Sequence, residues 1–170
     1  MRPATDQIWR WLAEVPDPEI PVISVTDLGI VRDVAWEGET LVVTVTPTYS
    51  GCPATAIINL DIETAVRGKG IDRLRIDRRL SPPWTTDWIG PEAREKLRDY
   101  GIAPPIDGTA ADGRLAARVD RLAGGGNLEI ACPRCGSTAT EKVSQFGSTP
   151  CKASYRCTDC LEPFDYFKCI

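Results

Sequence analysis

Two Cys-x-x-Cys pairs near the C-terminal end constrain the fold of this chain more than any other feature. The pairs are Cys132 with Cys135 and Cys157 with Cys160, and residues 136–156 separate them. Each pair places two thiolates on one tight turn, and an intervening ribbon brings four thiolates around a tetrahedral metal. The sequence has no His. We therefore expect a four-cysteine zinc ribbon over residues 128–170, with structural disulfides or a redox dithiol as alternatives and iron as an alternative metal.

Two more cysteines, Cys151 and Cys169, lie in the same region and exceed the four that a closed ribbon requires. They are candidates for spare core thiols, additional metal ligands or a second soft-metal site. Aromatic residues follow the second pair closely, and we expect Phe164, Tyr166 and Phe167 to form a small core beneath the metal turns, because so small a domain has little else to bury.

Charge and composition exclude several functional classes. The 170 residues carry a net charge of −4, whereas nucleic-acid binding requires a basic surface. The N-terminal residues contain no apolar signal sequence, and no apolar run approaches the roughly 20 residues of a membrane span. Seven cysteines is an odd number, which favours reduced thiols over a disulfide framework. We expect a cytoplasmic protein without membrane or nucleic-acid partners.

Hydrophobic periodicity before the ribbon predicts an α+β fold. The apolar spacing and turn residues indicate the order helix, strand, strand, helix, strand, helix, over residues 6–15, 30–36, 41–46, 53–67, 73–80 and 91–100. A small sheet covered by helices is a two-layer α/β sandwich. The predicted domains are the sandwich over residues 1–102, a flexible Pro-, Gly- and Ala-rich linker over 103–127, and the ribbon over 128–170.

Two side-chain faces follow from this assignment. The buried face of the helix over 53–67 is expected to comprise Ile57, Ile58, Ile62, Ala65 and Val66. The arginines of the third strand, at positions 73, 75 and 79, are expected to form a solvated face, with an anion site as the alternative.

Cys52 is the candidate for chemistry outside the ribbon. It precedes Pro53 at a predicted helix N-terminus, where the helix dipole and free N–H groups stabilise a thiolate that serves as nucleophile or soft-metal ligand. A buried core cysteine is the alternative. Because the chain has no His to activate a thiol, nucleophilic catalysis is nearly excluded. Asp17 and Glu19 flank Pro18 and are candidates for acid–base work or for a capping turn.

Several stretches of the sequence resemble two known protein families. Residues 15–21, 27–29 and 46–53 resemble a domain of the iron–sulfur cluster assembly (SufT-like) family. Residues 83–88, 98–102, 146–152 and 163–170 resemble the PaaD family of phenylacetate-degradation proteins, which provides one component of phenylacetyl-CoA epoxidase. The resemblance covers nearly the whole chain apart from the linker.

The resemblance implies a role in aromatic catabolism beside a di-iron oxygenase and its iron–sulfur reductase, rather than turnover of substrate. It makes Cys52 a candidate ligand of a transient iron–sulfur cluster, and Asp17 and Glu19 candidates for supporting that site. The chain is then a non-enzymatic maturation factor, with a homodimer as one arrangement. A zinc-binding adaptor that docks epoxidase subunits without carrying a cluster is the alternative.

Overall fold

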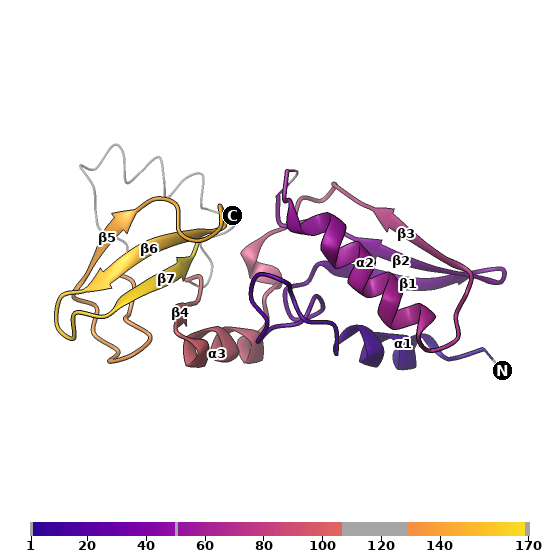
Figure 1. Ribbon diagram of the computed structural model, residues 1–170, viewed down its shortest axis with the longest axis horizontal. Helices are drawn as coiled ribbons and strands as arrows, with labels where there is room; N and C mark the ends of the chain where they lie inside the picture. The colour runs from indigo at the N-terminus through magenta and orange to yellow at the C-terminus, as the bar shows by residue number, and fades with distance from the viewer. Residues whose placement is uncertain (1, 50, 107–128, 169–170) are drawn as a thin grey trace. The chain divides into compact units, whose positions relative to one another are not determined.

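The computed structural model describes residues 2–49, 51–106 and 129–168, and the chain forms two compact units, Met1–Trp84 and Thr85–Ile170. The helices and strands appear along the chain in Figure 1. They are α1 (Thr5–Leu12), β1 (Val31–Glu37), β2 (Thr40–Val45), α2 (Ala54–Arg67), β3 (Leu74–Arg78), the 3-10 helix η1 (Thr86–Trp88), α3 (Pro91–Tyr100), β4 (Ile102–Ala103), β5 (Thr140–Ser144), β6 (Lys152–Cys157) and β7 (Pro163–Phe167).

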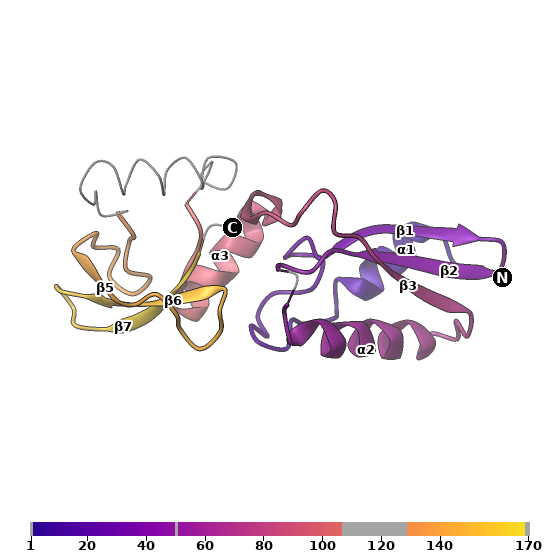
Figure 2. The same ribbon diagram turned by 90° about the horizontal axis from the view of Figure 1, so that it is seen from above.

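The first unit is a three-stranded sheet with two helices on one face. The strand order is β1-β2-β3, with β1 antiparallel and β3 parallel to the central strand β2. The β1–β2 hairpin turns through Gly38, whose φ of 58° lies in the left-handed region that glycine adopts without strain. Parallel strands require a crossover, and α2 supplies it between β2 and β3. Figures 1 and 2 show α1 and α2 on the same side of this sheet.

Aliphatic side chains between the sheet and these helices form the core of the first unit. Leu41, Val43 and Val45 of β2 are at most 1% exposed. The helix α2 contributes Ala54, Ile58, Ile62 and Val66, one residue every four positions.

The predicted buried face of α2 was wrong at Ile57, which is 51% exposed. Ile57 lies about 100° around the helix from this stripe, so it faces solvent.

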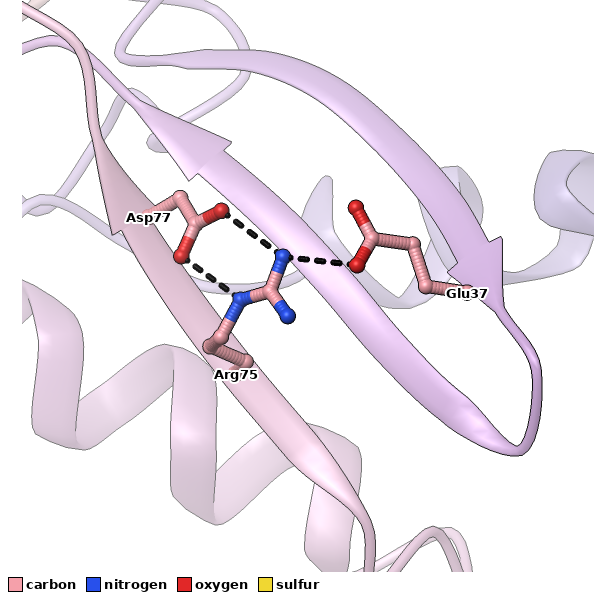
Figure 3. Close-up of polar contacts among 3 residues, drawn as sticks. All are labelled: Glu37, Arg75 and Asp77. Atoms are coloured by element: carbon pink, nitrogen blue, oxygen red, sulfur yellow. Dashed lines mark hydrogen bonds and ion pairs between the residues drawn. The ribbon is translucent and has the colours of Figure 1, made fainter.

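The face of the sheet away from the helices is charged. Arg75 of β3 donates from Nε to Asp77 (2.8 Å) and from Nη2 to Glu37 on β1 (2.9 Å). Figure 3 shows its guanidinium lying over β2 between the two carboxylates. The hydrogen bond from Arg75 holds the pKa of the Asp77 carboxyl below its ordinary value. Arg73 pairs with Glu39 at 2.5 Å. The prediction of a solvated face for these arginines is confirmed by their exposure.

The second unit contains a four-stranded sheet in the order β4-β7-β6-β5. Strands β5, β6 and β7 are antiparallel neighbours, and β4 lies parallel to β7 through Ile102 and Ala103. Arg94 of α3 donates to the carbonyls of Ile89 (3.0 Å) and Thr86 (3.1 Å) and to that of Pro105. These bonds join η1, α3 and the segment after β4.

The predicted α+β order is confirmed, but the units divide at another residue than expected. We expected α3 to close a sandwich over residues 1–102, whereas α3 and β4 belong to the second unit. The reason is the long-range pairing of β4 with β7. Most of the expected linker, residues 107–127, lies outside the described residues. Within the described part of the chain, every helix falls short of the length and apolarity needed to cross a bilayer.

Candidate functional site

The four paired cysteines converge on one point. The Sγ atoms of Cys132, Cys135, Cys157 and Cys160 all lie within 4.8 Å of one another. Sγ of Cys132 lies 3.8 Å from that of Cys160, and Sγ of Cys135 lies 3.6 Å from that of Cys157. Thiolates about 2.3 Å from a tetrahedral zinc are ~3.8 Å apart. The donor set and its spacing therefore fit zinc, and four protein thiolates leave no open coordination position.

Two backbone turns of the same design hold these thiolates. We call residues 132–137 the first knuckle and residues 157–162 the second knuckle. In the first, the N–H of Cys132 donates to the carbonyl of Ser137 (2.8 Å), and in the second the N–H of Cys157 donates to that of Glu162 (3.0 Å). The side chain of Ser137 donates to the carboxylate of Asp159, which joins the knuckles directly.

Within the second knuckle, the surroundings favour a thiolate at Cys157 and disfavour one at Cys160, whose pKa the neighbouring cysteines raise. The backbone N–H of Cys160 donates to Sγ of Cys157 at 3.5 Å. This hydrogen bond lowers the pKa of the Cys157 thiol to about 7. Metal ligation requires deprotonated cysteines.

A small aromatic core lies beneath the metal turns, as predicted for Phe164 and Tyr166, whereas Phe167 is buried outside this cluster. The Tyr155 ring stacks on Phe164 with centroids 5.9 Å apart and meets Tyr166 edge-on at 5.7 Å. Cys132 and Cys157 are part of the same buried cluster. Two of the four converging thiols therefore form part of the hydrophobic core.

Cys151 does not join the four thiols. Its side chain is buried at 6% exposure, and its Sγ lies 3.0 Å from the hydroxyl of Thr149. This placement agrees with a core thiol better than with a ligand of the same metal. Cys169, the other extra cysteine, lies outside the described residues.

Cys52 lies on the turn that leads into α2. Its N–H donates to the carbonyl of Tyr49 (3.2 Å), and its carbonyl accepts from the N–H of Thr55 (3.2 Å). Pro53 is the N-cap rather than the first helical residue. Cys52 is half-buried. The groups of three or more metal-binding side chains found among the described residues do not include Cys52.

Asp17 and Glu19 have different surroundings. Asp17 is 5% exposed, and its Oδ1 accepts from the backbone N–H groups of Glu19 (2.9 Å) and Ile20 (2.8 Å). This is the capping turn that the sequence offered as one alternative. Glu19 is half-buried. Neither carboxylate belongs to a group of three metal-binding side chains in the described chain.

Two features of the second unit were not predicted from the sequence. Lys152 is 4% exposed, and its amine lies 3.5 Å from the carboxylate of Asp165. Leu161 has a φ of 64°, in the left-handed region. The Lys152–Asp165 pair left no local signal. The Leu161 conformation was detectable, because Leu161 follows its Cys-x-x-Cys pair as Gly136 follows the other.

Two family models match the chain. An iron–sulfur cluster assembly protein model matches residues 5–73, and a PaaD zinc beta ribbon domain model matches residues 116–168. These matches fall on the sandwich and on the ribbon.

Named relatives extend this result. An Escherichia coli (strain K12) protein, described as a "Putative 1,2-phenylacetyl-CoA epoxidase" subunit, is 49% identical over 168 residues, which span 99% of this chain and 94% of the relative. A Porphyromonas gingivalis protein named "Fe-S protein maturation auxiliary factor" is 38% identical over 94 residues, 54% of this chain and 89% of the relative.

A solved structure also matches the N-terminal part. The crystal structure of a domain of unknown function, DUF59, from Bacillus anthracis is 27% identical, with a TM-score of 0.49, over 54% of this chain and 89% of that one. The identity and coverage of the Escherichia coli protein decide the assignment: the chain belongs to the PaaD family, with an iron–sulfur-assembly-like N-terminal region and a PaaD zinc ribbon.

Proposed function

We propose that this chain is a non-enzymatic accessory factor of the phenylacetyl-CoA epoxidase system in phenylacetate degradation. In this proposal it carries or delivers iron–sulfur or iron species through Cys52, and its ribbon binds zinc and docks epoxidase subunits. It acts in the cytoplasm, as a monomer or a homodimer. The names of the two relatives support the two halves of the proposal, the epoxidase system and iron–sulfur maturation.

One observation supports the proposal most: the two cysteine sites differ in the number of protein ligands that they offer to a metal. The ribbon supplies four thiolates to one point, which suits a permanent structural metal. Cys52 offers a single half-buried thiol on a turn. A carrier has to release its cargo, and incomplete protein ligation permits release. Cys52 therefore suits transient binding, whereas the ribbon suits permanence.

The test is anaerobic reconstitution with iron and sulfide. The wild type is expected to develop sulfur-to-iron charge-transfer absorbance that Cys52→Ala lacks, while both keep zinc. Cys151→Ala is the matched control, because it removes a cysteine that the metal group does not contain. Equal absorbance in the wild type and Cys52→Ala would contradict a ligand role for Cys52.

A second candidate, a zinc-only adaptor, has its own support. The described residues bring together one group of metal-binding side chains, and it is the ribbon group. An adaptor would hold about one zinc and no iron under every isolation condition. The reconstitution above separates the candidates, since only the carrier acquires iron.

A further inference from the structure

The two knuckles differ at one position that matters for backbone geometry. Each places a residue with positive φ directly after its second cysteine: Gly136 with φ 75° and Leu161 with φ 64°. The closing hydrogen bonds correspond, from Cys132 to Ser137 and from Cys157 to Glu162. The same turn therefore uses glycine once and leucine once.

Leucine is an unfavourable choice for this turn. The Cβ of an L-residue crowds the backbone in the left-handed region, which glycine enters freely. Among the described residues, Leu161 is the single non-glycine residue with positive φ. A glycine there would make the same turn, as Gly136 does. The fold of the second knuckle therefore does not explain why leucine stands at this position.

Packing within the unit does not explain it either. Leu161 is 59% exposed, and the buried cluster beneath the metal turns does not contain it. At the corresponding position of the first knuckle, a Cβ built on Gly136 meets nothing within 4 Å. This position points its side chain into open space. Non-glycine residues held in the left-handed region cluster at functional sites.

The surroundings of Leu161 indicate what it contacts. All residues from Thr158 to Pro163 are exposed, and the carboxylates of Asp159 and Glu162 flank the leucine. Arg134 lies 4.0 Å from Glu162, so two carboxylates and one guanidinium leave a net negative charge beside the leucine. An apolar tip beside two carboxylates complements an apolar socket bordered by Lys or Arg side chains.

We propose that Leu161 is the anchor of the surface through which the ribbon docks a protein subunit of the epoxidase system, inserting into an apolar socket with a basic rim. The inference rests on the proposed function for the identity of the partner. Asp159 and Glu162 steer the encounter, and Leu161 supplies the apolar contact that holds the complex.

The experiment measures binding of the zinc-loaded full-length chain to each purified epoxidase subunit by biolayer interferometry. Leu161→Gly removes both the side chain and the strain, Leu161→Ala removes the side chain alone, and Leu161→Met keeps the apolar bulk. Val143→Ala is the control, because Val143 is 64% exposed on the edge strand β5.

We expect Leu161→Gly and Leu161→Ala to weaken binding of one subunit about tenfold or more, the effect of losing a buried leucine side chain. Leu161→Met and Val143→Ala should bind like the wild type. Leu161→Gly should keep its zinc and melt at or above the wild-type temperature, so loss of binding does not reflect unfolding. Added salt should slow association of the wild type.

Three results would overturn the inference: wild-type affinity in Leu161→Gly, no binding of the wild type to any subunit, or self-association that disappears in Leu161→Gly. The last would assign Leu161 to contacts between copies of this chain. The anaerobic reconstitution measures cluster assembly at Cys52 separately. A negative binding experiment therefore does not contradict the carrier proposal. A negative reconstitution does not change the interpretation of the binding experiment.

Discussion

The N-terminal unit and the ribbon are stabilised in different ways. The first unit buries aliphatic side chains on both a sheet and two helices, including Leu41, Val43 and Ile62 at 0% exposure. The core cluster of the ribbon is small, and two of its members, Cys132 and Cys157, belong to the group of four converging thiols. The ribbon therefore draws on its thiol group for part of its core, whereas the first unit has an apolar core of its own. In the proposed function, the cysteine of the first unit, Cys52, binds a transient cargo.

The largest effect should come from removing a ribbon ligand. Cys135→Ala is expected to abolish zinc binding and unfold the ribbon, because a structural four-thiolate site contributes on the order of 10 kcal/mol to folding in apparent terms. Zinc content and hydrogen exchange check this, with Cys151→Ala as the control that keeps zinc. Loss of exchange protection in the first unit as well would contradict its independence from the metal.

A core substitution in α2 should have the next largest effect and should leave the ribbon unaffected. Ile62→Ala deletes a fully buried side chain, which costs about 2–5 kcal/mol. Ile57→Ala, on the exposed side of the same helix, should change stability by less than about 0.5 kcal/mol. Denaturant unfolding measures both. A large effect at Ile57 would indicate that this surface is covered, for example in a homodimer.

The turn around Asp17 distinguishes a structural from a ligand role. Asp17→Ala leaves two N–H groups, of Glu19 and Ile20, without their shared acceptor and should cost about 1–3 kcal/mol. Glu19→Ala should cost less. Thermal melts give the stabilities, and iron reconstitution gives the cargo. Unchanged stability together with lost iron in Asp17→Ala would make this carboxylate a ligand instead of a cap.

The smallest effect concerns the charged sheet face and depends on pH. The pairing with Arg75 lowers the pKa of Asp77, so its contribution is complete above the ordinary carboxyl pKa of about 4 and is lost as pH falls through the lowered value. Asp77→Asn should therefore be slightly less stable than wild type at pH 7 and equal to it near pH 2. A difference between the two proteins that grows toward acid pH would contradict this sign.

The features that could be predicted from the sequence are mostly those that depend on short, local sequence patterns. The four ribbon cysteines converge because each Cys-x-x-Cys pair is a local chelate, and the helices and strands follow short-range periodicity. The boundary between the units was not predictable in this way, because it depends on β4 pairing with β7, a partner about sixty residues away, and such contacts leave no local trace. Ile57 was misassigned because adjacent apolar residues on a helix, Ile57 and Ile58, look equivalent in a short window.

The surroundings of the candidate ligands Asp17 and Cys52 could not be predicted from the sequence for a similar reason. Asp17 lies between Pro16 and Pro18 in the sequence, where a capping residue and a metal ligand have the same composition. Its hydrogen bonds to Glu19 and Ile20 separate the two roles only once the backbone is known. The half-buried state of Cys52 likewise depends on how the loop before α2 packs, which residue types do not specify.

The most direct test of the central claim is the content of zinc, iron and acid-labile sulfide in protein isolated without air, for wild type and Cys52→Ser. The account predicts about one zinc per chain in both proteins, with iron and sulfide in the wild type and neither in the variant. About one zinc and no iron in the wild type, even after reconstitution, would contradict the carrier role and favour the adaptor. Equal iron in both proteins would contradict the role of Cys52.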